Sequence, residues 1–149
     1  MATRRKGFTL IEVLLVIAII GILAAVLFVA MDPMTQLKKA RDGRRKSDLD
    51  QIKKALYMYY NDQDEYPAGI PAPGNIFQSG SNVYMRRVPG NPPNNNPYGY
   101  LKNMATGDFC LQTELEIDYD PNAAESQGRC AAACGGMAVT PLSYLVCPD

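Results

Sequence analysis

Residues 8–31 read FTLIEVLLVIAIIGILAAVLFVAM, and this stretch decides how the chain is organised. It carries one charge, Glu12, and the 19 residues from Val13 to Met31 carry none. As a helix, this uncharged part spans roughly 28 Å, about the thickness of the hydrocarbon core of a bilayer. Because apolar residues cover every side of such a helix, the stretch predicts a membrane-spanning segment rather than one face of a soluble helix.

The preceding seven residues, MATRRKG, carry three cations and no anion. A removed secretory signal also begins with basic residues, but its apolar core usually runs only about 7–15 residues. A plain membrane anchor explains the length but not Glu12, because a carboxylate inside an apolar segment is costly unless it finds a partner or reaches water. Glu12 therefore distinguishes the alternatives.

Glu12 has two interpretations. In the first, it lies near the lipid headgroups and its carboxylate reaches water. In the second, the chain is cut between Gly7 and Phe8, which gives Phe8 a charged α-amine four residues before Glu12. That amine neutralises the Glu12 carboxylate of a neighbouring copy, in a medium where charge compensation is strong. We favour the second interpretation, in which Glu12 drives assembly and sets its register.

Four features of the N-terminus occur together: basic residues before Gly7, Phe8 after it, TLI at residues 9–11, and Glu12 at the fifth position past the cut. This combination resembles the class III leader and N-terminal helix of type IV pilins and type II secretion pseudopilins. The resemblance implies that a prepilin peptidase cleaves after Gly7 and N-methylates Phe8. It also implies an assembly platform protein and an ATPase as partners, with membrane lipid around the helix before assembly.

The apolar pattern becomes one-sided from Met34 to Tyr60, with the spacings of three and four that are typical of an amphipathic helix. The apolar positions are Leu37, Ala40, Leu49, Ile52, Leu56 and Tyr59. Opposite charges four residues apart, such as Asp42 and Lys46, are expected to pair on the outer face. We therefore expect one helix from Phe8 to about Asn61, with Pro33 as its weak point.

The predicted organisation has four parts. They are a cleaved leader (1–7), a transmembrane or filament-core helix (8–33), an amphipathic continuation of that helix (34–61) and a globular, disulfide-stapled β head (62–149).

A dense group of cations lies in the amphipathic part: Lys38, Lys39, Arg41, Arg44, Arg45 and Lys46. These cations have the charge to bind DNA or anionic lipid, but a solvated helix face explains them without a partner, and DNA binding is not indicated. The positive-inside rule applied to them favours a cytoplasmic C-terminus. The leader resemblance and the cysteines favour the opposite. We expect a single-pass protein with a cytoplasmic N-terminus and an exported head, found later in an extracellular or periplasmic filament.

The head differs sharply in composition from the helix. Ten of the 11 prolines lie from Pro67 onward and mark turns and loops. Residues 109–117, FCLQTELEI, alternate as a strand does. Other strands are expected at three places: 83–88, 98–101 and 143–147. Strands after a long helix predict a pilin-like α+β fold, in which the transmembrane and amphipathic helix packs on a small antiparallel sheet.

All four cysteines lie in the head: Cys110, Cys130, Cys134 and Cys147. Their spacing lacks a C-x2-C pair, which argues against a zinc site. An exported head of 88 residues has a small core. Two disulfides would stabilise it by about 2–4 kcal/mol each. We expect disulfides and leave the three pairings open.

Asp118, Asp120 and Asn122 place oxygen atoms at alternate positions, with Glu125 following, and Ca²⁺ prefers oxygen ligands. The resemblance adds that major pseudopilins bind calcium in a loop of the head. The glycine of an EF-hand loop is missing, however, and Pro121 interrupts the run. We therefore expect no metal and no cofactor.

The chain has no His, and its 15 cations balance 15 anions, so neither imidazole chemistry nor an overall basic field for nucleic acid is available. The head also shows no paired carboxylates or phosphate-binding loop. We expect a structural protein and not an enzyme. The first hypothesis is a subunit of a type IV pilus-like homopolymer. The alternative is a major, G-like pseudopilin of a type II secretion system, and the third is a monomeric membrane-anchored binding module.

Overall fold

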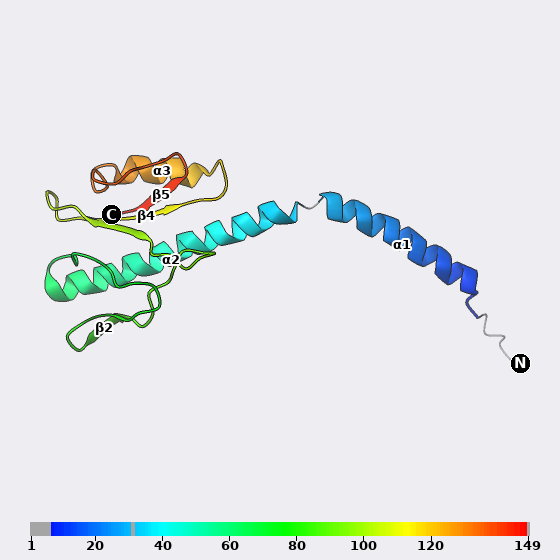
Figure 1. The fold of residues 1–149 in the computed structure, drawn as a ribbon, viewed down its shortest axis with the longest axis horizontal. Helices are drawn as coiled ribbons and strands as arrows, with labels where there is room; N and C mark the ends of the chain where they lie inside the picture. Colours follow the sequence, from blue (N-terminus) through cyan, green and yellow to red (C-terminus); the bar gives the residue numbers. More distant parts are fainter. Residues whose placement is uncertain (1–6, 31, 149) are drawn as a thin grey trace, which may run out of the picture. The chain divides into compact units, whose positions relative to one another are not determined.

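The computed structural model describes residues 7–30 and 32–148 (Figure 1). The chain divides into two compact units, Met1–Gln36 and Leu37–Asp149, which are described separately. Of the predicted leader, residues 1–6 lie outside the described part.

The first unit contains the helix α1, Leu10–Ala30. Its large apolar side chains are exposed all around, as Ile11 (75%), Ile17 (61%) and Leu23 (59%) show. Residues 10–29 are long and apolar enough to cross a membrane. A helix without a polar face needs lipid or other apolar helices around it, which agrees with the pattern of the sequence.

The expected single helix is wrong, because a second helix, α2, begins at Pro33 and runs to Gln63. Asp32 caps its start: the carboxylate accepts the amide hydrogens of Met34 and Thr35 at 3.2 and 3.3 Å. Pro33 follows the cap at the first helical position, where a missing N–H costs nothing. Asp-Pro is thus a helix start, whereas the sequence analysis treated Pro33 only as a weak point.

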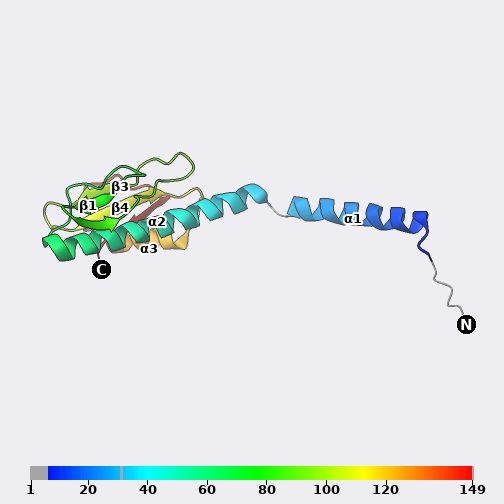
Figure 2. The ribbon, with the colours of Figure 1, turned by 90° about the horizontal axis from the view of Figure 1, so that it is seen from below.

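The second unit contains α2 from Leu37 onward and all later elements. Its elements after α2 are β1 (Phe77–Ser79), β2 (Asn82–Met85), β3 (Gly99–Lys102), β4 (Phe109–Glu114), α3 (Pro121–Cys130) and β5 (Ser143–Val146). The strands β1 and β2 form an antiparallel hairpin, and β3, β4 and β5 form an antiparallel sheet with β4 in the centre. Figure 2 shows the strands grouped beside the C-terminal half of α2. The predicted α+β, pilin-like fold is confirmed.

The three-stranded sheet is buried on both faces. On one face Phe109 and Leu111 of β4 pack on Leu49, Ile52 and Leu56 of α2. On the other face, Cys110 and Leu145 pack with the end of α3. In Figure 1, β4 and β5 lie between α2 and α3 accordingly. Alternate residues of a strand point to opposite faces, so β4 buries both sets.

Two predicted features of α2 and β4 are wrong. Leu37 is 53% exposed and Ala40 is also exposed, so burial of α2 begins only at Asp42. The strand expected to reach Ile117 ends at Glu114, because the amides of Glu116 and Ile117 donate to Asp42 instead. The sequence pattern did not predict β1 or α3.

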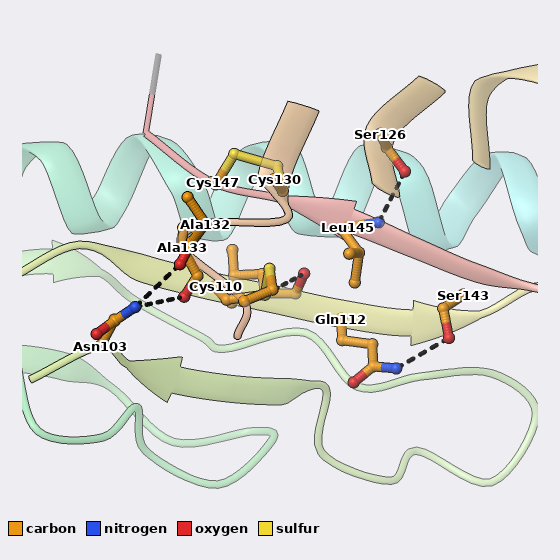
Figure 3. Close-up of a disulfide and its surroundings, with 12 residues drawn as sticks. Asn103, Cys110, Gln112, Ser126, Cys130, Ala132, Ala133, Ser143, Leu145 and Cys147 are labelled. Atoms are coloured by element: carbon orange, nitrogen blue, oxygen red, sulfur yellow. Dashed lines mark hydrogen bonds between the residues drawn. A yellow bond between two sulfur atoms is a disulfide. The ribbon is translucent and has the colours of Figure 1, made fainter. Parts of the chain in front are cut away.

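The four cysteines form two disulfides, Cys110–Cys134 and Cys130–Cys147. The first ties the segment after α3 to β4, and the second ties the last residue of α3 to the residue that follows β5, as Figure 3 shows for Cys130–Cys147. A hydrogen bond also joins β5 to α3, because the amide of Leu145 donates to Ser126 Oγ at 3.1 Å. The expectation of disulfides is confirmed, and the structure selects one of the three pairings.

Candidate functional site

The predicted assembly residues lie at the start of α1. Phe8 is 79% exposed and Glu12 is exposed in the first turn of the helix. A carboxylate in a first turn is favoured by the helix dipole, which is positive at this end. Gly7 and Phe8 precede the helix, so the predicted cleavage point lies in non-helical chain.

Glu12 has an intrachain partner that the sequence analysis missed. The amide of Glu12 donates to Thr9 Oγ1 at 3.3 Å, and the Thr9 hydroxyl donates to Glu12 Oε2 at 3.4 Å. Thr followed three residues later by Glu is the sequence signature of a capping box. The T-x-x-E spacing at residues 9–12 was therefore the available signal. Glu12 helps to begin α1 in addition to any role between copies.

A buried cluster of charges fastens α2 to the head, and Arg45 lies at its centre. Only 5% of the Arg45 side chain is exposed. Its guanidinium donates to Asp42 Oδ1 at 2.5 Å and to Glu116 Oε1 at 2.6 Å. It also donates to Asn91 Oδ1 at 2.7 Å and to the Pro92 carbonyl at 2.6 Å. One side chain therefore holds two separate loops of the head against α2.

The neighbours of Arg45 complete the cluster. The Asp42 carboxylate accepts the amides of Glu116 and Ile117 at 3.0 and 3.1 Å. Arg41 binds Glu116 with two hydrogen bonds, at 2.8 and 2.5 Å. Hydrogen bonding to Arg41, with a further contribution from Arg45, outweighs desolvation and lowers the pKa of Glu116 to about 2. Bidentate and charge-assisted bonds of this kind are among the stronger ones in proteins.

Lys46 holds the next part of the head. Its ammonium donates to Asp120 Oδ2 at 2.5 Å, while Asp120 Oδ1 accepts the amide of Asn122 at 2.9 Å and so caps α3. Burial works against ionisation of Asp120, but the bonds from Lys46 and Asn122 prevail and lower its pKa. Asp-Pro at 120–121 is a helix start, as it is at 32–33.

Of the three residues predicted as alternate oxygen ligands, Asp118, Asp120 and Asn122, Asp120 has other partners in the structure. Asp120 is committed to Lys46 and to the start of α3. Among residues 7–30 and 32–148, no group of three or more Asp, Glu, Cys or His side chains lies close enough to hold a metal ion.

The prediction that the cations form a solvated helix face is wrong for half of them. Arg41, Arg45 and Lys46 bind carboxylates of the head. The expected pairing of Asp42 with Lys46 is replaced by Asp42 with Arg45 and Lys46 with Asp120. The sequence could not show this, because the partners lie 71–75 positions away. Lys38 and Lys39 remain exposed, and Arg44 is 68% exposed.

This chain is similar to known proteins both in a short N-terminal motif and over most of its length. The prokaryotic N-terminal methylation motif matches residues 2–28. Among whole relatives, the type II secretion system core protein G of Pseudomonas aeruginosa is 35% identical over 121 residues, which cover 72% of this chain and 81% of that protein. The core protein G of Vibrio cholerae is 34% identical over 110 residues, 66% of this chain and 71% of the relative.

A pilin is also similar. The type IV major pilin protein PilA of Myxococcus xanthus is 28% identical over 115 residues, which cover 76% of this chain and 44% of the pilin. The comparison with solved structures gives no significant match. The extent and identity of the matches to core protein G show the family, and the chain therefore belongs to the pilins and pseudopilins.

Proposed function

We propose that this chain is the repeating subunit of a helical filament that is assembled from a membrane. The observation that carries the proposal is α1, an apolar helix exposed on all sides, which follows Phe8 and has the Thr9 cap and Glu12 at its start. Such a helix is suited to lipid before assembly and to the α1 helices of other copies afterwards. Contacts between unlike surfaces that do not close into a ring give an open helix of one repeated subunit.

The comparisons favour a pseudopilus over a pilus, which reverses the order of the sequence analysis. The chain matches 81% of the core protein G of P. aeruginosa at 35% identity, but 44% of the M. xanthus pilin at 28% identity. We therefore propose a major pseudopilin, whose filament acts in a type II secretion system. A cell-surface pilus is the second candidate, and the match to PilA supports it.

The proposed processing uses the residues at the start of α1. A prepilin peptidase cuts between Gly7 and Phe8 and methylates the Phe8 amine. The amine of one copy then pairs with Glu12 of its neighbour, which sets the register. The N-terminus lies in the cytoplasm and the head is exported. A platform protein and an ATPase supply the energy of assembly. No enzymatic activity is proposed for this chain.

The charge cluster has a mechanical role in this proposal. A force that is applied to a subunit at α1 must pass along α2 to reach the head. The bonds from Arg41 and Arg45 to Glu116, and from Lys46 to Asp120, join the head to α2 where its burial begins. These bonds therefore keep the head on its helix while the filament extends.

The test is the intact mass of the chain in sheared filaments. We expect a filament fraction in which the chain has lost residues 1–7 and gained about 14 Da as one methyl group. A chain that keeps its first seven residues and never leaves the membrane fraction would contradict the proposal and favour a monomeric anchored binding module. In a strain that lacks this chain, loss of protein secretion with surface pili still present would favour the pseudopilus over the surface pilus.

A further inference from the structure

A groove opens in the head between the last turns of α2 and the β1–β2 hairpin. It has a volume of about 520 Å³ and is lined by Met58, Asn61, Asp62, Ser81, Asn82, Val83 and Tyr84. Stacking of Tyr59 on Phe77 and its edge contact with Tyr84, at 5.6 and 5.3 Å between ring centres, hold the hairpin beside α2. The walls of the groove are therefore set by the aromatic core.

The chemistry of the groove suits a cation on an aliphatic stem. Met58 and Val83 are 47% and 51% exposed and supply apolar walls. Asp62 supplies a carboxylate, whose Oδ2 accepts a hydrogen bond from Asn82 at 3.0 Å. A lysine side chain covers apolar surface with its carbon chain and carries its charge to the end.

The hydroxyl of Tyr84 lies buried beside the groove, close to Asp62. Tyr84 is 8% exposed, and its hydroxyl is the one buried side-chain polar atom among the described residues that meets no hydrogen-bond partner. Burial and the nearby Asp62 raise the pKa of Tyr84, so the group remains a neutral hydroxyl that can accept a hydrogen bond. An orphaned buried hydroxyl is costly unless something else satisfies it.

The charges along α2 run against its own helix dipole. Asp62 lies in the last turn, Asp64 and Glu65 follow directly, and the last turn holds no basic residue. Carboxylates at this negative end are unfavourable within one copy. The opposite half of the same helix carries Lys38 and Lys39, which are exposed and form no ion pair within residues 7–30 and 32–148. The two ends of α2 are therefore complementary to each other.

We propose that the groove beside Asp62 receives Lys38 and Lys39 of a second copy of this chain. Lys38 and Asp62 are 24 positions apart on one helix. A copy displaced by about 36 Å along α2 therefore brings its lysines to the groove of the next. The contact joins unlike surfaces and extends into an open stack.

Other occupants fit the groove less well. The carboxylates of Asp62 and Asp64 repel nucleic acid and anionic lipid, whereas Glu65 is already paired with Lys102 at 2.9 Å. Arg86 and Arg87 are exposed too, but they follow β2 at the acidic end itself, so they do not link opposite ends of the head. The proposal rests on the proposed filament, which supplies neighbouring copies at high effective concentration.

Charge reversal in the full chain tests the interface. Lys38→Glu with Lys39→Glu, and separately Asp62→Lys, are each expected to reduce the yield of sheared filament about tenfold, because like charges then meet. The three substitutions together are expected to restore the yield. Glu125→Lys, on the exposed face of α3, is the matched control and is expected to leave it unchanged. Intact mass confirms that every variant is processed.

Cross-linking tests the same contact without relying on yield. All four natural cysteines are in disulfides, so copies carrying Lys38→Cys and Asp62→Cys, produced together, have thiols only at these positions. A covalent dimer is expected in mixed filaments and not when either variant is produced alone. Three outcomes would each overturn the interface and leave the proposed function standing. The first is a normal filament yield from both the lysine reversal and Asp62→Lys, and the second is the absence of a mixed dimer. The third is rescue of Asp62→Lys by charge reversal of Arg86 and Arg87 instead of Lys38 and Lys39. A wild-type chain that forms no filament would overturn both.

Discussion

Arg45 and Glu116 are 71 positions apart in the sequence, and Arg45 Nη2 donates to Glu116 Oε1 at 2.6 Å. The bond therefore connects α2 to the segment that follows β4. Because Arg45 is buried, removing it leaves the buried Asp42 carboxylate without its cation, while Glu116 keeps its pair with Arg41. Breaking a buried pair in this way is strongly destabilising.

Arg45→Met is therefore expected to lower the free energy of unfolding by about 3–5 kcal/mol, measured by urea denaturation. Arg44→Met is the matched control, since Arg44 is largely exposed and lies 3.8 Å from Asp48. We expect it to change stability by less than about 0.5 kcal/mol. Equal effects of the two substitutions would show that the cluster does not fasten the head.

Stability is expected to fall in acid through Glu116. Its pKa is lowered from 4.5 to about 2 in the folded chain. A lowered pKa means that the ionised form stabilises the fold, so the contribution is complete above pH 4.5 and is lost as the pH falls toward 2. The pKa of Asp120 is also lowered, so its contribution changes in the same direction. The contribution of Glu116 is measured by thermal melts of the wild-type chain and Glu116→Gln between pH 7 and about 2. The variant should lose less stability over the acid part of this range than the wild type, and identical slopes would contradict the assignment.

Calcium is expected to leave the Tm of the head unchanged. Lys46 occupies the Asp120 carboxylate at 2.5 Å, and the other oxygen atom of Asp120 caps α3. A ligand that binds only the folded state raises Tm by mass action. We therefore expect the same Tm in excess EDTA and in millimolar Ca²⁺, and a rise of several degrees in Ca²⁺ would reveal a site that the structure does not provide.

Two buried tyrosines give opposite predictions. The Tyr98 hydroxyl donates to Asp48 Oδ2 at 2.8 Å, whereas the Tyr84 hydroxyl has no partner among the described residues. Tyr98→Phe leaves Asp48 without this donor and is expected to cost about 1–3 kcal/mol. Tyr84→Phe removes an unsatisfied group and is expected to be neutral or stabilising for the unassembled chain. Denaturation of both variants measures the difference, and a loss at Tyr84 as large as at Tyr98 would mean that its hydroxyl is satisfied within the chain.

The sequence predicts those parts of the fold that depend on local pattern. The 19 uncharged residues from Val13 to Met31 predict the membrane helix, and the alternation that starts at Phe109 predicts the central strand. The disulfide pairing and the partners of Arg45 depend on contacts between distant positions, so no local spacing reveals them. The Thr9–Glu12 spacing and the two Asp-Pro helix starts were local signals in the sequence. They were overlooked because these residues were interpreted as part of the apolar segment, as a weak point of one helix and as calcium ligands.

The central claim is that the charge of Glu12 joins one copy to the next. Because the Glu12 carboxylate also accepts a hydrogen bond from the hydroxyl of the Thr9 cap, alanine alone cannot test the claim. Glu12→Gln removes the charge and retains the ability to cap, since Gln serves at this position too. We expect both Glu12→Gln and Glu12→Ala to be cleaved normally and to yield at least about tenfold less sheared filament than the wild type. Filaments at wild-type yield from Glu12→Gln, with loss only in Glu12→Ala, would contradict the claim and leave Glu12 as a helix cap.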